Sequence, residues 1–237
     1  QVNVYTGTTT GEFGGYWIVG GVMSEFHNYN DIYSFEVTPV LDNVTGAIDH
    51  SQTVTSPLNY EAVFESPWYV LTQNTSLPSW TNVYALTEYP QYLWLSFVVS
   101  LRNHSNGDWL GFFASDLATD TLGHLVAEEA RSIDENEIII VEKSTGYVVA
   151  ISDATPLFKV HDDGSIERYD GSNSRTPQIR ETLRHVRKKY GRLFTTLGMR
   201  REEMQIRTGS RSIFIALQPL VDRHGLEWIV IQSTNRV

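Results

Sequence analysis

Residues 92–122 of the 237-residue chain read YLWLSFVVSLRNHSNGDWLGFFASDLATDTL, and this stretch decides the fold. Its first ten residues alternate in character, and successive side chains of a β-strand point to opposite faces. One face is uniformly apolar and predicts a core: Leu93, Leu95, Phe97, Val99 and Leu101. The other face mixes aromatic and hydroxyl side chains, as the floor of a ligand pocket would: Tyr92, Trp94, Ser96, Val98 and Ser100. After a polar turn at 104–107, residues 109–115 are predicted to form the partner strand of a hairpin.

Two helices are predicted beyond this hairpin, because the spacing of apolar residues there becomes helical. The first covers about 119–131, and its apolar positions include Leu122 and Val126. The second begins at Thr176 and Pro177, a typical cap followed by a typical first-turn residue. Five residues carry the apolar face of this second helix: Ile179, Leu183, Val186, Tyr190 and Leu197.

Short strands account for most of the remaining pattern, and the polar stretch 162–174 is predicted to be a loop. The expected strands are 16–19, 33–40, 83–86, 137–142, 147–151, 213–217 and 228–231. Strands, helix, strands, helix and strands in this order predict an α+β fold of two modules. We expect the division near Asp116, which gives modules 1–116 and 117–237.

Charge and aromatic residues are distributed unevenly along the chain. Residues 1–101 contain nine acidic residues and no Lys or Arg, whereas 175–237 contain thirteen basic and five acidic residues. Nineteen of the 28 aromatic residues lie in the first 110 positions. An acidic, aromatic-rich front half is a poor match for nucleic acid, so we expect no nucleic-acid partner. The same composition suits a pocket for a small molecule.

Several classes of chemistry lack their sequence patterns. The chain contains no cysteine, which excludes disulfides and thiolate metal sites. It also has no phosphate-binding glycine loop, no Gly-x-Ser-x-Gly nucleophile motif and no apolar run near the ~20 residues of a membrane span. We therefore expect no enzymatic activity, no catalytic residues, no metal and no cofactor.

Acidic pairs keep one enzymatic hypothesis open as a minority interpretation. Glu61 with Glu65, or Asp162 with Asp163, could supply the two carboxylates of a glycoside hydrolase. His124 and Glu128 lie four residues apart on the first predicted helix. A lone pair of this kind is more typical of a surface contact than of a metal site.

Four motifs, in order along the chain, resemble the double Cache (dCache) family of extracytoplasmic ligand-binding modules of transmembrane receptors. They are Pro67-Trp68-Tyr69, PSWTNVY at 78–84, GDWLGFFASDLATDTL at 107–122 and GLEWIVIQSTNRV at 225–237. The resemblance as a whole covers nearly the whole chain. The resemblance implies two PAS-like modules, each an antiparallel sheet with flanking helices. It makes 1–116 the membrane-distal, ligand-binding module and 117–237 the membrane-proximal one.

The resemblance also implies a set of ligand-binding residues. Amino-acid-binding members of the family have an Arg two residues before a Trp-Tyr pair, a Tyr further on and then an Asp. The matching positions here are Ser66, Trp68, Tyr69, Tyr84 and Asp116. In such members the Arg holds the ligand carboxylate and the Asp takes the ammonium group. Ser66 in place of Arg therefore favours a neutral or amine ligand. The predicted pocket is completed by Trp80, Trp94 and Ser96.

Each of these residues also has a purely structural interpretation. Trp68 and Tyr69 could pack in a core between helix and sheet, and Tyr84 could be an ordinary strand residue. Asp116 could cap the helix that follows it. An isolated buried carboxylate is costly, so we expect Asp116 to accept hydrogen bonds from Tyr or backbone donors.

The resemblance implies an extracellular or periplasmic small-molecule sensor domain of a membrane-spanning receptor of the cyclase, sensor-kinase or chemoreceptor type. The alternative is a carbohydrate-binding or adhesion module, which would leave its aromatic side chains on an open surface. Members of the family normally begin with a long helix that mediates dimerisation, whereas this sequence opens with strand-like residues. The resemblance therefore implies a homodimer that forms through an N-terminal helix, and this helix is absent from this sequence. Val237 and the basic residues Arg184, Arg187 and Lys188 are expected near the bilayer.

Overall fold

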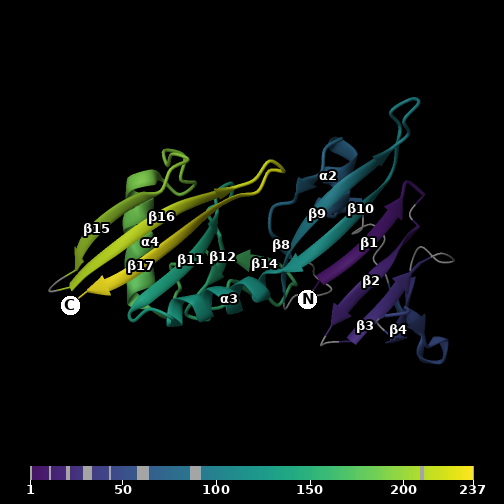
Figure 1. The fold of residues 1–237 in the computed structure, drawn as a ribbon, viewed down its shortest axis with the longest axis horizontal. Helices are drawn as coiled ribbons and strands as arrows, with labels where there is room; N and C mark the ends of the chain where they lie inside the picture. Colours follow the sequence, from purple (N-terminus) through teal and green to yellow (C-terminus); the bar gives the residue numbers. More distant parts are fainter. Residues whose placement is uncertain are drawn as a thin grey trace. The chain divides into compact units, whose positions relative to one another are not determined.

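The computed structural model describes residues 2–10, 12–19, 22–28, 34–42, 44–57, 64–85, 92–208 and 211–236. The chain forms two compact units: unit 1 contains Gln1–Tyr84 and Trp94–Ala118, and unit 2 contains Ala85–Leu93 and Thr119–Val237. Each unit has its own antiparallel sheet with helices beside it (Figure 1), which confirms the predicted α+β class. No helix in the described ranges is both long and apolar enough to cross a bilayer.

Unit 1 is built on a sheet in which its first strand, β1, lies beside its last strand, β10. The strand order is β5-β4-β3-β2-β1-β10-β9-β7, with β6 paired to β4 and β8 paired to β9. The strands are β1 (Val2–Thr8), β2 (Phe13–Val19), β3 (Val22–His27), β4 (Ser34–Asp42), β5 (Ala47–Ile48), β6 (Val54–Pro57), β7 (Ser79–Trp80), β8 (Tyr84–Ala85), β9 (Leu93–Arg102) and β10 (Trp109–Ala118). The 3-10 turn η1 (His50–Gln52) and helix α2 (Pro67–Asn74) also belong to unit 1. Tyr33 and Leu86, at ends of two predicted strands, lie outside the described residues.

The predicted hairpin is confirmed by β9 and β10, which pair antiparallel over 94–102 and 109–118. Both faces of β9 are covered near its start, because Leu93, Trp94, Leu95 and Ser96 are all buried. Helix α3 (Thr119–Arg131) begins at the residue after β10 ends, so no loop separates the two elements.

Helix α2 has no counterpart in the sequence predictions. Pro67 at its first position and Ser66 before it are typical of a helix start, but the helix ends after eight residues. Trp68, Tyr69 and Thr72 are buried, and the helix packs against β10. Two turns of helix are too short to give a clear apolar periodicity, so the sequence pattern does not predict this helix.

Unit 2 has a smaller sheet that repeats the central arrangement of unit 1. Its order is β12-β11-β17-β16-β15, so the first strand again lies between the second and the last. The strands are β11 (Asn136–Glu142), β12 (Val148–Ile151), β15 (Glu202–Thr208), β16 (Arg211–Val221) and β17 (Glu227–Arg236), with a separate pair β13 (Phe158–Val160) and β14 (Ile166–Arg168). The helices are α3, at its predicted bounds, and α4 (Pro177–Tyr190).

The core of unit 2 is mostly aliphatic and lies between α4 and the sheet. Ile179, Leu183 and Val186 of α4 pack with Ile139 and Ile229 of the central strands, and all five side chains are buried. Strand β11 is buried on both faces, and the second helix, α3, packs against β11 and β12. The two helices therefore give the central strands of this sheet the cover that their apolar sequences require.

Three sequence predictions in unit 2 are wrong in detail. Residues 166–168 form β14 inside the predicted loop 162–174. Helix α4 ends at Tyr190 because Gly191 has a left-handed φ of 79°, so Leu197 reaches the core from the following loop instead of from the helix. Strand β15 was not predicted, since three residues of its sequence EEMQIRT are charged and only Met204 and Ile206 are apolar.

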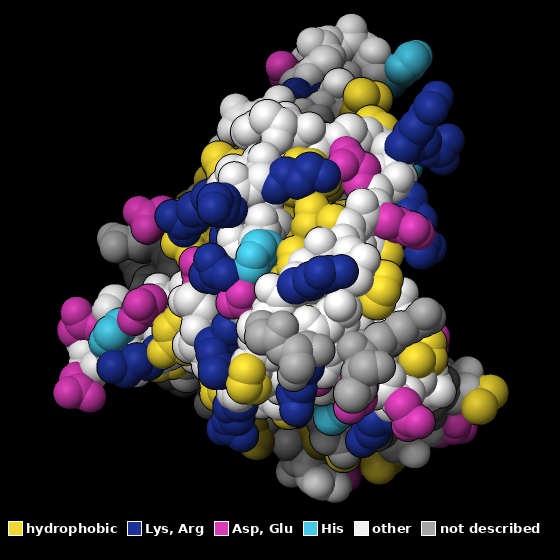
Figure 2. Space-filling view, turned by 90° about the vertical axis from the view of Figure 1, so that its left-hand side faces the viewer, with side chains coloured by type: hydrophobic (Ala, Val, Ile, Leu, Met, Phe, Trp, Pro, Cys, Tyr) yellow, Lys and Arg dark blue, Asp and Glu magenta, His cyan; other side chains and the backbone are white. Residues whose placement is uncertain are grey.

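We predicted that the basic residues of α4 lie near residue 237, and this prediction is wrong for Arg187. Its Nη2 donates hydrogen bonds to the carbonyl oxygens of Gly146, at 3.0 Å, and Asp170. Gly146 lies in the turn after β11, and the end of β11 pairs with the beginning of β17. Arg187 is therefore at the opposite end of β17 from Arg236. Figure 2 also shows acidic side chains interspersed with the basic ones on the face that it draws.

The close approach of β1 and β2 depends on Gly15, which lies directly opposite Tyr5. A Cβ atom at Gly15 would lie 2.2 Å from the carbonyl oxygen of Val4 and 2.6 Å from the Cβ of Tyr5. Both distances are far below van der Waals contact, so a side chain at this position would push the two strands apart.

We expect Gly15→Ala to lower the free energy of unfolding of unit 1 by about 1–3 kcal/mol, because overpacking strains the strand pair. Gly14→Ala is the matched control in the same strand, since the nearest atom to its added Cβ is 3.0 Å away. Denaturant unfolding followed by Trp fluorescence measures the effect, because five of the six Trp residues belong to unit 1. Equal unfolding midpoints for the two variants would contradict the steric explanation.

Candidate functional site

Asp116 is the centre of the candidate site, and strand pairing places polar residues on both sides of it. It lies on β10, directly opposite Asn3 on β1 and Ser96 on β9. Directly opposite residues in antiparallel strands project from the same face. The three side chains therefore form a polar row across the middle of the sheet, and all three are buried.

Hydroxyl groups hold the carboxylate of Asp116 in place. The Tyr5 hydroxyl donates a hydrogen bond to Asp116 Oδ1 at 2.9 Å, and Ser96 Oγ donates to the same atom at 2.6 Å. The Tyr84 hydroxyl lies 2.7 Å from Ser96 Oγ. Because Ser96 has one hydroxyl hydrogen and gives it to Asp116, Tyr84 is the donor in this last contact. The expected hydrogen bond from Tyr to Asp116 is confirmed.

Burial dominates the electrostatics of this network. It raises the pKa of Asp116 to about 6, although hydrogen bonds from Ser96, Tyr5 and Asn3 act in the opposite direction. Burial, followed by the negative charge of Asp116, raises the pKa values of Tyr5 and Tyr84 well above their usual range. Both phenols therefore stay protonated at neutral pH and remain hydrogen-bond donors.

No basic side chain is paired with Asp116 in the part of the chain that the structure describes. Residues 1–101 contain no Lys or Arg. Arg102, at the far end of β9, is engaged elsewhere and donates to the carbonyl oxygen of Gln73 at 2.7 Å. A buried carboxylate with neutral donors and no cation favours a cationic ligand, because that ligand would supply the missing opposite charge.

Aromatic side chains surround the tyrosine that holds Asp116. The ring of Trp68 meets that of Tyr5 edge-on, with 5.4 Å between centroids, and stacks on Phe13 with an interplanar angle of 11°. The neighbouring Tyr69 lies edge-on to Trp109 at 5.2 Å. Trp68 and Tyr69 therefore belong to the aromatic core of unit 1, and Trp68 also contacts the hydrogen-bonded network at Tyr5.

The remaining predicted site residues are spread more widely. Ser66 is buried at the start of α2, and Trp94 is buried at the start of β9, opposite Ala118. Trp80 packs against Phe97 with 4.9 Å between ring centroids. Phe97 follows Ser96 directly in β9, so Trp80 lies on the side of that strand away from the polar row.

Sequence analysis missed Asn3 and Tyr5 because they act through a long-range contact. Tyr5 and Asp116 are 111 residues apart, and only the pairing of β1 with β10 brings them together. No motif marks either residue. The one available signal is the strand-like character of the first residues, which places Asn3 and Tyr5 on the same face of β1.

The residues of the minority hypotheses occupy exposed positions where the structure describes them. Glu65 is exposed, and Glu61 lies outside the described residues. Asp163 accepts a hydrogen bond from the backbone N–H of Ser165 at 2.9 Å, so it shapes a turn. Among the described residues, no group of three or more His, Asp or Glu side chains could hold a metal ion.

The raised pKa of Asp116 makes the stability of unit 1 pH-dependent. The folded state favours the protonated form of Asp116 more than the unfolded state does. The protonated side chain therefore contributes its full stabilisation of unit 1 below the ordinary pKa of 3.8, and this stabilisation is lost as the pH rises through about 6. Between pH 4 and 7.5 we expect Asp116→Asn to gain about 2–2.5 kcal/mol relative to the wild type, measured by denaturant unfolding at each pH. Asp108→Asn, at an exposed position beside β10, is the control. A constant difference across this pH range would contradict the raised pKa.

Comparison with known proteins yields structural neighbours only. A scan of protein-family models and a search of curated proteins find no match. The chain is similar to the ligand-binding domain of the Pseudomonas fluorescens chemoreceptor CtaA in complex with L-serine, with 12% sequence identity and a TM-score of 0.50. The alignment covers 98% of this chain and 72% of that one.

Two further structures have TM-scores of 0.47. One is the ligand-binding domain of the amino-acid chemoreceptor PctB of Pseudomonas aeruginosa in complex with L-Arg, 15% identical, with 99% of this chain and 71% of that chain covered. The other is Methyl-accepting Chemotaxis protein X, 14% identical, with 85% of this chain and 63% of that chain covered. This chain also spans 59% of the extracellular domain of the histidine kinase mmHK1S-Z2. The chain has the fold of the CtaA ligand-binding domain, and the double Cache resemblance is thereby confirmed at the level of the fold.

Proposed function

We propose that this chain is the extracellular or periplasmic sensor domain of a transmembrane signalling receptor, and that unit 1 binds a small amine or neutral molecule beside Asp116. The parent receptor is of the chemoreceptor, sensor-kinase or cyclase type. One observation carries the choice of site: Asp116 is 5% exposed, is held only by neutral donors, and is paired with no basic residue in the described ranges.

Charge argues for the class of ligand. An amine would place its positive charge against the Asp116 carboxylate and would lower the pKa that burial has raised. The rings of Trp68 and Tyr5 add faces that attract cations, each worth about 0.5–2 kcal/mol when well placed. The CtaA domain binds L-serine, which carries both an ammonium and a carboxylate group. Ser66 stands where the family pattern has an Arg, so a ligand without a carboxylate fits this chain better.

Signalling by such a domain requires two states that the ligand distinguishes, because a ligand shifts an equilibrium only through its differential affinity. The hydrogen bonds within the site suggest what those states are. Tyr5 and Ser96 occupy Asp116 Oδ1, and an ammonium group would compete with them for the same oxygen. Release of the Tyr5 hydroxyl would remove one hydrogen bond between β1 and β10, which distinguishes a ligand-bound state from the arrangement in which Tyr5 contacts Asp116.

Burial favours a sensor over a carbohydrate-binding or adhesion module. A sugar-binding platform presents aromatic faces on an open surface, but Trp68, Tyr69 and Trp94 are at most 5% exposed. Unit 1 as the membrane-distal module, unit 2 as the membrane-proximal module, the homodimer and the absence of enzymatic activity all stay predictions.

We expect isothermal titration with tyramine, adenine and malate at pH 7.5 to give the tightest binding for the amine. Asp116→Asn should weaken tyramine binding at least about tenfold, because it removes a buried charge partner. Lowering the pH from 6 to 5 should weaken tyramine binding to the wild type by roughly fivefold, since Asp116 becomes protonated below its pKa of about 6.

Asp108→Asn controls for the loss of a carboxylate elsewhere in unit 1, and it should leave the affinity for tyramine unchanged. Malate binding that is equally tight in the wild type and in Asp116→Asn would end the amine proposal.

A further inference from the structure

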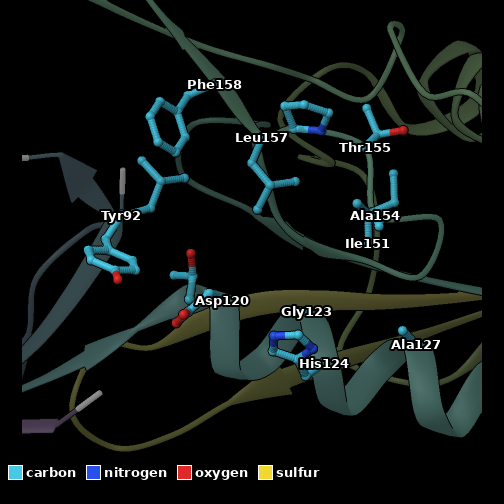
Figure 3. A pocket seen from close by; sticks show the side chains of 13 residues that line it. Tyr92, Asp120, Gly123, His124, Ala127, Ile151, Ala154, Thr155, Leu157 and Phe158 are labelled. Carbon is cyan, nitrogen blue, oxygen red and sulfur yellow. The ribbon is translucent and has the colours of Figure 1, made fainter. Parts of the chain in front are cut away.

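Unit 2 contains a cavity of about 250 Å³ that the predicted ligand site does not include. Every residue that lines it belongs to unit 2. One wall is a face of α3, and the opposite wall is formed by the end of β12 and the segment that follows it. Figure 3 shows Asp120, Gly123 and Ala127 on the helix across from Thr155, Leu157 and Phe158. The size suits a molecule smaller than most drug-sized ligands.

The cavity has an apolar interior with polar groups on one side. Leu93 and Ile151 are buried in its wall, and Leu157 and Phe158 are half-buried beside them. Asp120 and His124, one turn apart on α3, are exposed at the cavity. This combination of an apolar body and a few polar groups is typical of small-molecule sites.

Gly123 keeps the cavity open. It lies inside α3, where glycine destabilises a helix relative to alanine. A Cβ atom at Gly123 would meet no other atom within 4 Å, so no neighbouring element requires the glycine. Any larger side chain at this position would extend into the cavity. Among the described residues, the space beside α3 is therefore the only structural feature that depends on the absence of a side chain at Gly123.

The opposite wall is held rigidly. Ala154 has a left-handed φ of 54°, a backbone conformation that residues other than glycine rarely adopt. Asp153 fixes this segment, since its carboxylate accepts hydrogen bonds from the backbone N–H of Thr155 at 3.0 Å and of Thr176 at 3.1 Å. Thr176 immediately precedes α4. The wall is thus shaped before any ligand arrives and is tied to the start of the core helix.

Asp120 sets the charge of the cavity. Its Oδ1 accepts a hydrogen bond from the backbone N–H of Thr121 at 2.8 Å, and no ion pair within 4.0 Å involves it among the described residues. A protonated amine could reach this carboxylate while its apolar part lies against Leu157 and Phe158. The aromatic ring of Phe158 also favours a positive charge nearby.

We propose that unit 2 contains a second ligand site, in the cavity between α3 and residues 151–158, that takes a small aliphatic or aromatic amine with its ammonium group at Asp120. The site does not rest on the function proposed for unit 1, because it shares no residue with the Asp116 network. A ligand there would touch both α3 and the segment that anchors α4.

The test is a titration of the uniformly ¹⁵N-labelled 237-residue chain with isoamylamine, followed by amide chemical shifts. Isoamyl alcohol and isovalerate are the matched neutral and anionic probes. We expect isoamylamine to shift the amides of Gly123, Ala127 and Ala154, and isovalerate to leave them unchanged. Asp120→Asn should weaken the amine about threefold, the scale of an exposed ion pair, without changing the affinity for the alcohol.

Gly123→Leu should fill the cavity and abolish these shifts, and its open surroundings allow the variant to fold. Gly198→Leu is the matched control, because Gly198 also lies in unit 2 with no atom within 4 Å of its added Cβ, and it should retain binding. Asp116→Asn should retain the cavity shifts as well, which separates this proposal from the one for unit 1. Binding of isoamylamine that survives in Gly123→Leu, or isovalerate binding as tightly as the amine, would overturn the second site.

Discussion

A carboxylate buried without a cation is the constraint on which the architecture of unit 1 depends. Removing an ionised carboxylate from water costs several kcal/mol unless hydrogen bonds replace the lost solvent. Four strands contribute to that replacement: β1 through Tyr5, β8 through Tyr84, β9 through Ser96, and β10 through Asp116 itself. The network therefore fixes the register of strands that are far apart in the sequence. Gly15 contributes indirectly, because only glycine lets β2 lie so close behind Tyr5.

The two units share a strand order but differ in what they bury. Unit 2 encloses an aliphatic core between α4 and the sheet, with Ile139, Ile179 and Ile229 at its centre. Unit 1 instead packs aromatic rings around a polar row. An aliphatic core tolerates little but other aliphatic groups, whereas aromatic rings and hydroxyls can form new contacts with a polar molecule. The aromatic and hydroxyl composition of the unit 1 core distinguishes the surroundings of Asp116 from the aliphatic core between α4 and the sheet of unit 2.

The spacing of apolar residues predicted the elements of this fold that are long enough to show a clear period. The alternation at 92–101 predicted β9, and the apolar spacing after it predicted α3 at its observed bounds. Strand β15 was not predicted because only Met204 and Ile206 of its seven residues are apolar, and α2 is too short to show a period at all. For the site, Asp116, Ser96 and Tyr84 were predicted and lie together. Tyr5 was not, because a contact across 111 residues leaves no trace in a single sequence.

The direct junction of β10 and α3 has a mechanical consequence. A loop absorbs a small displacement by changing its backbone dihedral angles, but Ala118 ends the strand, Thr119 begins the helix, and both are buried. No loop therefore lies between Asp116 and the first turn of α3 that could absorb a small shift of Asp116 along its strand. Inserting a flexible residue between Ala118 and Thr119 would supply the loop that this junction does without.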